Sequence, residues 1–320
     1  MTSLREAIRR FFTPAKPLPP GTYHYQAPAD APSPYRLHLR LEEDGSGILI
    51  LNASTVLHLN PTATEYVYHI IHQTPENQVA RSVAARYQVT YDQALDDFHT
   101  LTERIDTLIT TPDLDPVTFL DFGREEPYSG IISAPYRLVC ALTYRTTSDI
   151  VPGATPVERV SRELLTGEWQ TILEKAWNAG IPHVLFTGGE PTIRPDLPEL
   201  ITYCEKLGQV TGLLTDGLRL SETTYLHKLL QSGLDHLMLV MDPEEEQTWE
   251  ALRDVLAEDL FTTVHLTLTE ENHSQISSVL ERLQQKGVTS LSLSANSPSL
   301  SDELQAARQQ AAELGLTLVW

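Results

Sequence analysis

The sequence is poor in cysteine: its 320 residues include only two, Cys140 and Cys204. So few thiols, with no paired spacing, exclude a disulfide framework. Cys140 lies in the apolar run 138–142 and Cys204 in the helical pattern of 200–204, so each is expected to be a small buried hydrophobe. Two thiols on separate elements do not make a four-iron site, because thiolates ligate such clusters.

Basic residues and long apolar runs are also scarce. Lys and Arg number 23 against 43 Asp and Glu, which gives a formal charge of −20. That balance excludes nucleic acid as an expected partner, because binding to a phosphate backbone needs clustered Lys and Arg. No apolar run is long enough for a transmembrane segment. The charged N-terminus is unlike a secretory signal, so we expect a cytoplasmic protein with a basic or apolar partner.

Residues 1–34 are predicted to form an amphipathic helix and a Pro-rich linker. One helical face carries Leu4, Ile8, Phe11 and Phe12, and the other carries Arg5, Arg9 and Arg10. Such a helix either seeks a membrane surface or docks on its own domain, and the second is the simpler interpretation. Prolines between 14 and 20 end the helix.

Residues 35–110 have the pattern of a small winged-helix-like α+β domain. Strands are predicted at 35–41, 48–52 and 55–59, and helices at 62–73, 76–87 and 91–109. Asn60 followed by Pro61 is a typical helix start, because Asn caps the first turn and proline suits the first helical position.

This domain resembles the PqqD-like recognition elements (RiPP recognition elements) of ribosomal-peptide maturation. The similarity lies in Leu59-Asn60-Pro61-Thr62-Ala63, the following helices and Val89-Thr90-Tyr91-Asp92. It implies that a precursor (leader) peptide adds as a strand beside 55–59, by β-augmentation, and rests on the last helix. The implied peptide-binding residues are Thr55, Leu57, His58, Phe98, Leu101 and Arg104.

Two other interpretations of this domain stay open. Winged-helix modules often bind DNA, but an acidic helix face disfavours that function here; its residues are Asp92, Asp96, Asp97, Glu103 and Asp106. The domain could also serve only for packing, with no ligand.

A polar connector at 111–134 leads to an α/β region at 135–320. Strands are predicted at 137–143, 183–187, 208–214, 236–241, 262–267 and 290–294, with a further strand beginning at 316. Helices are predicted at 155–179, 195–207, 222–232, 244–257, 274–286 and 301–314. Alternating strands and helices indicate a parallel sheet. The expected fold is α/β, with six βα units that match a partial (βα)6 TIM barrel.

The strand that ends in Phe186-Thr187-Gly188-Gly189-Glu190-Pro191 resembles the S-adenosylmethionine-binding turn of radical SAM enzymes. The resemblance implies that Gly188, Gly189, Glu190 and Pro191 line a cofactor site at the carboxyl ends of the strands. Thr215 and Asp216, in Thr215-Asp216-Gly217, match the Thr-Asn-Gly of the family, with Asp in place of Asn.

The same family holds a [4Fe–4S] cluster on a Cys-x3-Cys-x2-Cys loop after the first barrel strand. Here Leu142-Thr143-Tyr144-Arg145 matches the start of that loop, but Thr146, Ile150 and Gly153 occupy the three cysteine positions. We therefore expect no cofactor: no [4Fe–4S] cluster and no reductive cleavage of S-adenosylmethionine, with residual binding of that molecule as the remaining option.

These patterns favour a radical-SAM-like pseudoenzyme that has lost its cluster. It would bind a precursor peptide and scaffold its maturation, with an active maturation enzyme as a second partner. No catalytic residue is assigned, and none of His183, His227, His236 and His265 forms a metal pair at helical spacing. One alternative is a non-radical enzyme in which Glu190 and Asp216 do acid–base chemistry. The other is that only this copy lost its cysteines and its relatives are ordinary radical SAM enzymes.

Overall fold

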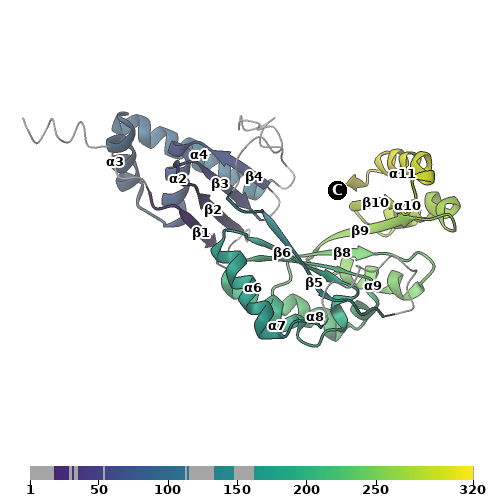
Figure 1. Cartoon of the computed structure of the whole chain (residues 1–320). Helices are drawn as coiled ribbons and strands as arrows, with labels where there is room; N and C mark the ends of the chain where they lie inside the picture. The colour runs from purple at the N-terminus through teal and green to yellow at the C-terminus, as the bar shows by residue number, and fades with distance from the viewer. Residues whose placement is uncertain are drawn as a thin grey trace, which may run out of the picture. The chain divides into compact units, whose positions relative to one another are not determined.

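The protein, described here from a computed structural model, divides into two compact units (Figure 1). Unit 1 comprises Met1–Pro135 with Asn178–Pro182, and unit 2 comprises Tyr136–Trp177 with His183–Trp320. The structure describes residues 18–28, 31, 35–52, 55–111, 114, 133–147 and 162–319. The predicted amphipathic helix of 1–34, most of the connector and the positions of Ile150 and Gly153 lie outside the described residues.

Unit 1 contains a four-stranded antiparallel sheet in the order β1-β2-β3-β4. Its strands are β1 (Gly21–Gln26), β2 (Arg36–Leu41), β3 (Gly47–Leu51) and β4 (Thr55–Leu59). The register places Leu39 opposite Leu49 and Leu49 opposite Leu57, so these apolar side chains share one face. Strand β1 corrects the prediction that 1–34 is only a helix and linker. Pairing with β2 stabilises this segment, and its short local pattern does not reveal that pairing.

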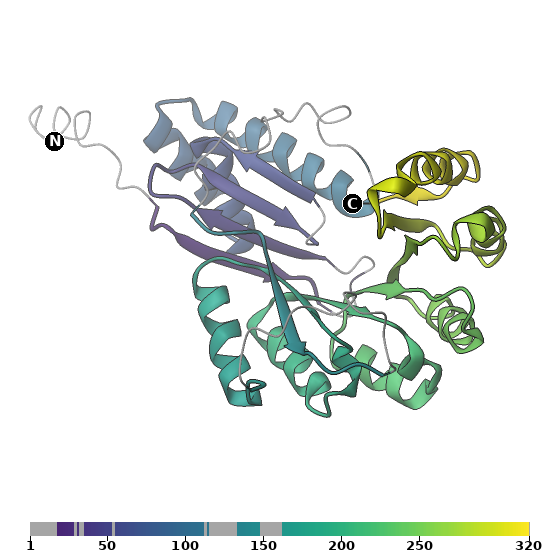
Figure 2. The same ribbon diagram turned by 45° about the vertical axis from the view of Figure 1, so that its right-hand side comes forward.

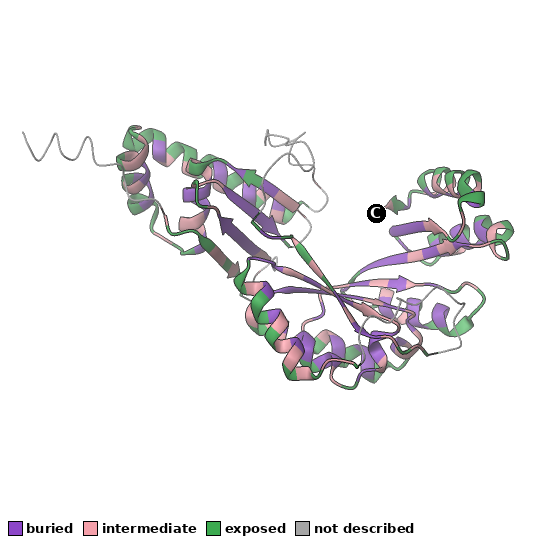
Figure 3. Ribbon diagram, viewed as in Figure 1, coloured by how far each residue is buried: buried purple, intermediate pink, exposed green. Residues whose placement is uncertain are grey.

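Three helices follow the sheet: α2 (Pro61–Ile71), α3 (Glu76–Tyr87) and α4 (Tyr91–Thr110). Asn60 caps α2 by accepting a hydrogen bond from the Ala63 amide at 2.9 Å, and Thr90 caps α4 in a reciprocal pair with Gln93. The helices pack on the sheet face that carries Leu39, Leu49 and Leu57, and form one apolar core with it (Figure 3). The helices lie where the sequence predicts them.

Unit 2 contains a seven-stranded parallel sheet in the order β11-β10-β9-β8-β7-β6-β5 (Figure 2). Its strands are β5 (Arg137–Thr143), β6 (His183–Gly188), β7 (Val210–Thr215), β8 (His236–Val240), β9 (Phe261–Leu268), β10 (Ser290–Ala295) and β11 (Thr317–Leu318). Its helices are α6 (Thr166–Asn178), α7 (Leu197–Leu207), α8 (Thr223–Gln231), α9 (Glu246–Leu256), α10 (Ile276–Gln285) and α11 (Ser301–Glu313). Each strand therefore lies beside the next one in the chain, which is the common arrangement of consecutive strands.

The core of unit 2 lies between one face of this sheet and its helices. Along β6, Val184 and Phe186 are fully buried in that core, whereas His183, Leu185 and Thr187 alternate with them and are partly exposed. Short 3-10 turns follow four strands: η1 (Pro191–Ile193), η2 (Leu218–Ser221), η3 (His273–Gln275) and η4 (Pro298–Leu300). The strand pattern matches the prediction. The predicted helix of 155–179 is too long over its described part, because residues 162–165 are not helical and α6 begins at Thr166. No helix in the described part of the chain is long and apolar enough to cross a bilayer.

Candidate functional site

The turn after β6 lies directly against the backbone that leaves β5. The Gly189 amide donates to the Thr143 carbonyl at 2.8 Å, and the Glu190 amide donates to the Arg145 carbonyl at 2.7 Å. Gly188 has φ of 141°, and a Cβ there would lie 2.3 Å from the Thr143 carbonyl oxygen. The paired glycines are therefore required for this close approach of two backbone segments.

Glu190 joins the ends of β6 and β7. Its carboxylate accepts hydrogen bonds from the Thr192 amide at 2.8 Å, the Thr215 hydroxyl at 2.7 Å and the Asp216 amide at 2.8 Å. The side chain is 1% exposed. Burial, and then the charge of Asp216, raise the pKa of Glu190 to about 7. The structure thus brings together Glu190, Thr215 and Asp216, as the sequence predicts, but Glu190 points into the protein and not toward an open site.

The segment after β5 is tied to the same edge of the sheet. The Thr147 hydroxyl donates to Asp216, and the half-buried Thr146 precedes it. At the other end of the undescribed segment 148–161, Glu163 accepts hydrogen bonds from Thr143 and from Arg145. Thr146, at the first of the three predicted cysteine positions, therefore directly precedes the residue that contacts Asp216.

Sequence reasoning missed Arg194, which stabilises this edge. Its guanidinium pairs with both Asp196 oxygens at 2.9 and 2.7 Å and donates to the carbonyls of Leu142 at 3.0 Å and Leu164 at 3.1 Å. The Arg194 side chain is 7% exposed. An Arg two residues before an Asp, directly after the Gly-Gly-Glu-Pro motif, was the available signal. Arg194 thus connects the end of β5 to the segments just before α6 and α7.

In unit 1, the predicted peptide-binding residues divide into exposed and buried sets. His58 is exposed, and Thr55, Phe98 and Arg104 are partly exposed. Leu57 and Leu101 are 3% and 8% exposed and belong to the core. The sequence predicted both as peptide-binding residues, but their side chains lie in the core. The alternation along β4 turns Leu57 inward, and the helical period of α4 turns Leu101 inward.

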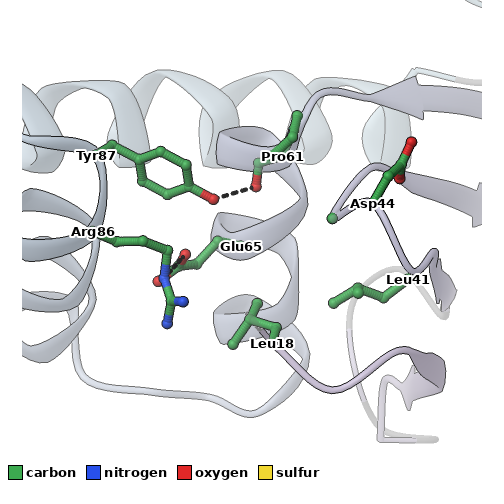
Figure 4. Close-up of a pocket in the computed structure, with 8 residues that line it drawn as sticks. Leu18, Leu41, Asp44, Pro61, Glu65, Arg86 and Tyr87 are labelled. Carbon is green, nitrogen blue, oxygen red and sulfur yellow. Dashed lines mark hydrogen bonds and ion pairs between the residues drawn. The ribbon is translucent and has the colours of Figure 1, made fainter. Parts of the chain in front are cut away.

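Unit 1 also has a small pocket of about 150 Å³ that the sequence did not predict (Figure 4). Its lining residues are Leu18, Leu41, Asp44, Gly45, Pro61, Glu65, Arg86 and Tyr87. Burial raises the pKa of the Glu65 carboxyl, but contacts with His69, Arg86 and Ser82 outweigh that effect and leave the pKa lowered. The Arg86 guanidinium lies 2.6 Å from Glu65, so the charge that faces this pocket is already neutralised.

Comparison with known proteins finds similar sequences and similar structures. Residues 140–242 match the Radical SAM superfamily model. The PqqA peptide cyclase of Streptomyces rochei is 33% identical over 156 residues, which are 44% of this chain and 43% of that protein. The PqqA peptide cyclase of Granulibacter bethesdensis is 29% identical over 174 residues, 49% of this chain and 46% of that protein. The chain thus spans less than half the length of the curated relatives it matches.

Solved structures of Streptococcus suis SuiB share the fold. SuiB bound to its precursor peptide SuiA has a TM-score of 0.57 at 16% identity, over 88% of this chain and 70% of that one. SuiB bound to S-adenosylmethionine has a TM-score of 0.56 at 15% identity, over 88% and 69%. Residues 140–242 are therefore a domain of the radical SAM type, and the chain is homologous to the peptide cyclases over less than half its length.

These matches overturn the expectation that the chain has no cofactor. The matched model describes radical SAM proteins, and the similar SuiB structure has S-adenosylmethionine bound. S-adenosylmethionine with an iron–sulfur cluster is therefore the cofactor set that the domain implies. The expectation was wrong because it inferred the loss of both S-adenosylmethionine and the cluster from three side chains at the cysteine positions. The fold around the S-adenosylmethionine site depends instead on the apolar core and on the Gly-Gly-Glu-Pro turn.

The residues present fit one part of that set and not the other. At the turn, the Thr192 hydroxyl is buried and has no hydrogen-bond partner in the described part of the chain, and Asp216 is half-buried. These are suitable groups for a polar organic cofactor. Cys140 and Cys204 are 3% and 0% exposed, and burial raises the pKa of Cys140 to about 12. Among the described residues, no group of three or more His, Cys, Asp or Glu is arranged to hold a metal. The oxygen donors here therefore do not fit thiolate ligation of iron.

Proposed function

We propose that this chain is a precursor-peptide-binding pseudoenzyme of the radical SAM type, which holds a ribosomal peptide during its maturation by another enzyme. The homology to PqqA peptide cyclases supports the substrate class. The fold shared with SuiB, a protein that binds a precursor peptide, supports the binding role. Peptide binding is the central part of the proposal.

The observation that carries the peptide-binding role is the position of β4. Among the described strands, β4 lies at one edge of its sheet and pairs only with β3. An edge strand presents backbone donors and acceptors that an extended peptide can pair with. The exposed His58 and the partly exposed Thr55 lie on this strand, where a bound peptide would pass them.

The charge of α4 indicates the chemistry of the bound peptide. Asp92, Asp96, Asp97, Glu103 and Asp106 are all exposed on this helix. Because acidic side chains attract Lys and Arg at short range, a leader with basic residues beside an extended apolar segment is the expected ligand. DNA is disfavoured by the same charges.

Fluorescence anisotropy tests the binding role with a labelled synthetic peptide, in which Lys and Arg residues flank an extended apolar segment. Asp96→Lys with Asp97→Lys should weaken binding at least tenfold, whereas the exposed Glu281→Lys on α10 serves as the matched charge control and should have little effect. Equal affinities for the parent protein, the double variant and the Glu281→Lys control would contradict the assignment of the peptide site to β4 and α4.

The pseudoenzyme part is supported by Thr146, Ile150 and Gly153 at the three thiolate positions and by the two buried cysteines. We expect the protein to bind S-adenosylmethionine at the β6 turn without cleaving it reductively. Anaerobic reconstitution, an iron and sulfide assay, and product analysis after reduction test this expectation. A stoichiometric four-iron cluster with cleavage of S-adenosylmethionine would show an active enzyme instead.

A second candidate is non-radical acid–base chemistry at Glu190 and Asp216. One observation favours it: the pKa of Glu190 is raised to about 7, close to the value that suits a general acid or base at neutral pH. The three hydrogen bonds that Glu190 accepts from its own chain weigh against it. Turnover of a bound metabolite that Glu190→Gln abolishes without loss of folding would favour this candidate.

A further inference from the structure

Two histidines that are far apart in the sequence meet on the sheet face opposite the core of unit 2. His183 is the first residue of β6 and His236 the first of β8, and β7 lies between these strands. Their Nε2 atoms are 3.1 Å apart, with ring centroids 4.8 Å apart and ring planes inclined by 61°. Both side chains are partly exposed. The pair lies at the start of the strands, at the opposite end from Glu190 and the β6 turn.

Gly212, in the middle of β7, is the reason that the two rings can meet. A Cβ at this position would lie 2.1 Å from Nε2 of His236 and 2.5 Å from its Cε1. The His236 ring therefore lies across the glycine backbone and reaches over β7 toward β6. A glycine inside a strand is unfavourable unless something must approach closely, and here that something is an imidazole ring.

The contact between the two Nε2 atoms is close. Two ring nitrogens that both present lone pairs would repel each other at 3.1 Å, so either a proton or a cation lies between them. Histidine ligates a cation through such a ring nitrogen.

We propose that His183 and His236 form a two-histidine site for a divalent cation of the Zn²⁺, Ni²⁺ and Cu²⁺ group. With metal–nitrogen bonds of about 2.0–2.1 Å, the 3.1 Å separation corresponds to a nitrogen–metal–nitrogen angle of about 100°, close to tetrahedral or square geometry. Imidazole ligands select this group over Mg²⁺ and Ca²⁺, which prefer oxygen.

The surroundings determine how the site would be completed. Since both rings are partly exposed, water or a carboxylate or carbonyl of a bound molecule can take the remaining positions. Arg137 is exposed and lies opposite His183 in the β5–β6 register. Its positive charge repels a cation but is screened by water. The site is independent of peptide binding at β4, so either proposal can fail alone.

Titration of untagged, metal-free protein with Ni²⁺ and Zn²⁺ by calorimetry tests this site, together with the electron paramagnetic resonance spectrum of the Cu²⁺ form. We expect one site per chain and two nitrogen ligands in the Cu²⁺ spectrum. His183→Gln and His236→Gln should each lower the affinity at least tenfold, and Arg137→Gln should raise it severalfold. His227→Gln is the matched control. His227 is an exposed histidine on α8 that pairs with Glu258, and its replacement should leave the metal affinity unchanged.

Gly212→Ala supplies a test that leaves both ligands in place. The added methyl group should displace the His236 ring and lower the affinity as much as removing a histidine does. Circular dichroism checks that each variant is folded. Folded variants that bind metal as tightly as the parent protein, or a parent protein that binds none, would overturn the proposal and leave a hydrogen-bonded imidazole pair only.

Discussion

At the residue scale, Glu190 shows how one buried carboxylate organises the end of a parallel sheet. Its three hydrogen bonds connect the β6 turn to the end of β7, and burial holds it at a raised pKa. The Gly-Gly-Glu-Pro sequence therefore has a structural function whether or not a cofactor is bound. In the same turn, the buried Thr192 hydroxyl has no hydrogen-bond partner among the described residues, and the half-buried Asp216 accepts from Thr147 and Leu218.

The raised pKa of Glu190 predicts a stability that depends on pH. The folded carboxyl, with its pKa of about 7, holds its proton in a range where the unfolded carboxyl, with a pKa near 4.5, has lost it. The free energy of unfolding should therefore fall as pH rises from about 4.5 to about 7. Glu190→Gln should flatten this slope in urea unfolding at pH 5 and pH 7.5. Glu199→Gln, at an exposed position on α7, should leave the slope as it is, and an unchanged slope in Glu190→Gln would refute the assignment.

A second residue-scale prediction concerns the coupling of Gly212 and His236. Gly212→Ala should lower the free energy of unfolding by about 2 kcal/mol, because the new methyl group overlaps the imidazole ring. His236→Ala removes that ring, so the double variant should be more stable than the sum of the single changes predicts. Urea unfolding of the four proteins measures the coupling, and strict additivity would contradict the contact.

At the scale of elements, helix ends and strand ends are stabilised by a few polar groups. Arg194 contacts the end of β5, Leu164 two residues before α6, and the start of α7 through carbonyls and Asp196. Thr90 and Gln93 satisfy donors at the start of α4. These groups position apolar elements that burial alone would leave free to slide.

Arg194→Ala should be strongly destabilising. It removes the guanidinium donors of Asp196, which keeps the Thr166 hydroxyl, and of the Leu142 and Leu164 carbonyls, which costs about 3 kcal/mol. Arg253→Ala is the control, since Arg253 and Asp254 form an ion pair in which Arg253 is exposed and such pairs contribute little. Thermal or urea unfolding compares the two, and similar losses for both would contradict the role of Arg194.

Thr90→Ala should lower stability by about 1 kcal/mol, because the capping hydroxyl of α4 is lost. Thr107 lies in the last turns of the same helix, and its hydroxyl donates to the Glu103 carbonyl. Thr107→Ala should therefore have little effect on stability. Chemical denaturation distinguishes the two substitutions. A larger loss at Thr107 would be inconsistent with capping at Thr90.

At the scale of the whole molecule, the two units have separate apolar cores with no residue in common. We therefore predict that Thr90→Ala lowers hydrogen-exchange protection mainly in β2–β4 and α2–α4, and that Arg194→Ala lowers it mainly in β5–β8. Mass spectrometry of exchanged amides measures both. Loss of protection across both units in each variant would show that the chain unfolds as one cooperative body instead.

Much of the secondary structure could be predicted from the sequence alone. The period of apolar residues identified α2–α4 and the alternation of strands and helices in unit 2, because the buried face of each element is written into its own residues. Two local motifs, Asn60-Pro61 and Gly188-Gly189-Glu190-Pro191, also identified the start of α2 and the turn after β6.

Only the tertiary structure decided the contacts between distant residues. Strand β1 exists through its pairing with β2, Leu57 and Leu101 turn into the core, and Glu190 points inward to Thr215 and Asp216. Arg194 reaches the ends of three elements, and His183 meets His236 across Gly212. Periodicity reports which face of an element is buried, but it carries no information on which partner lies opposite. That choice depends on strand order and register, which form only when the whole chain packs.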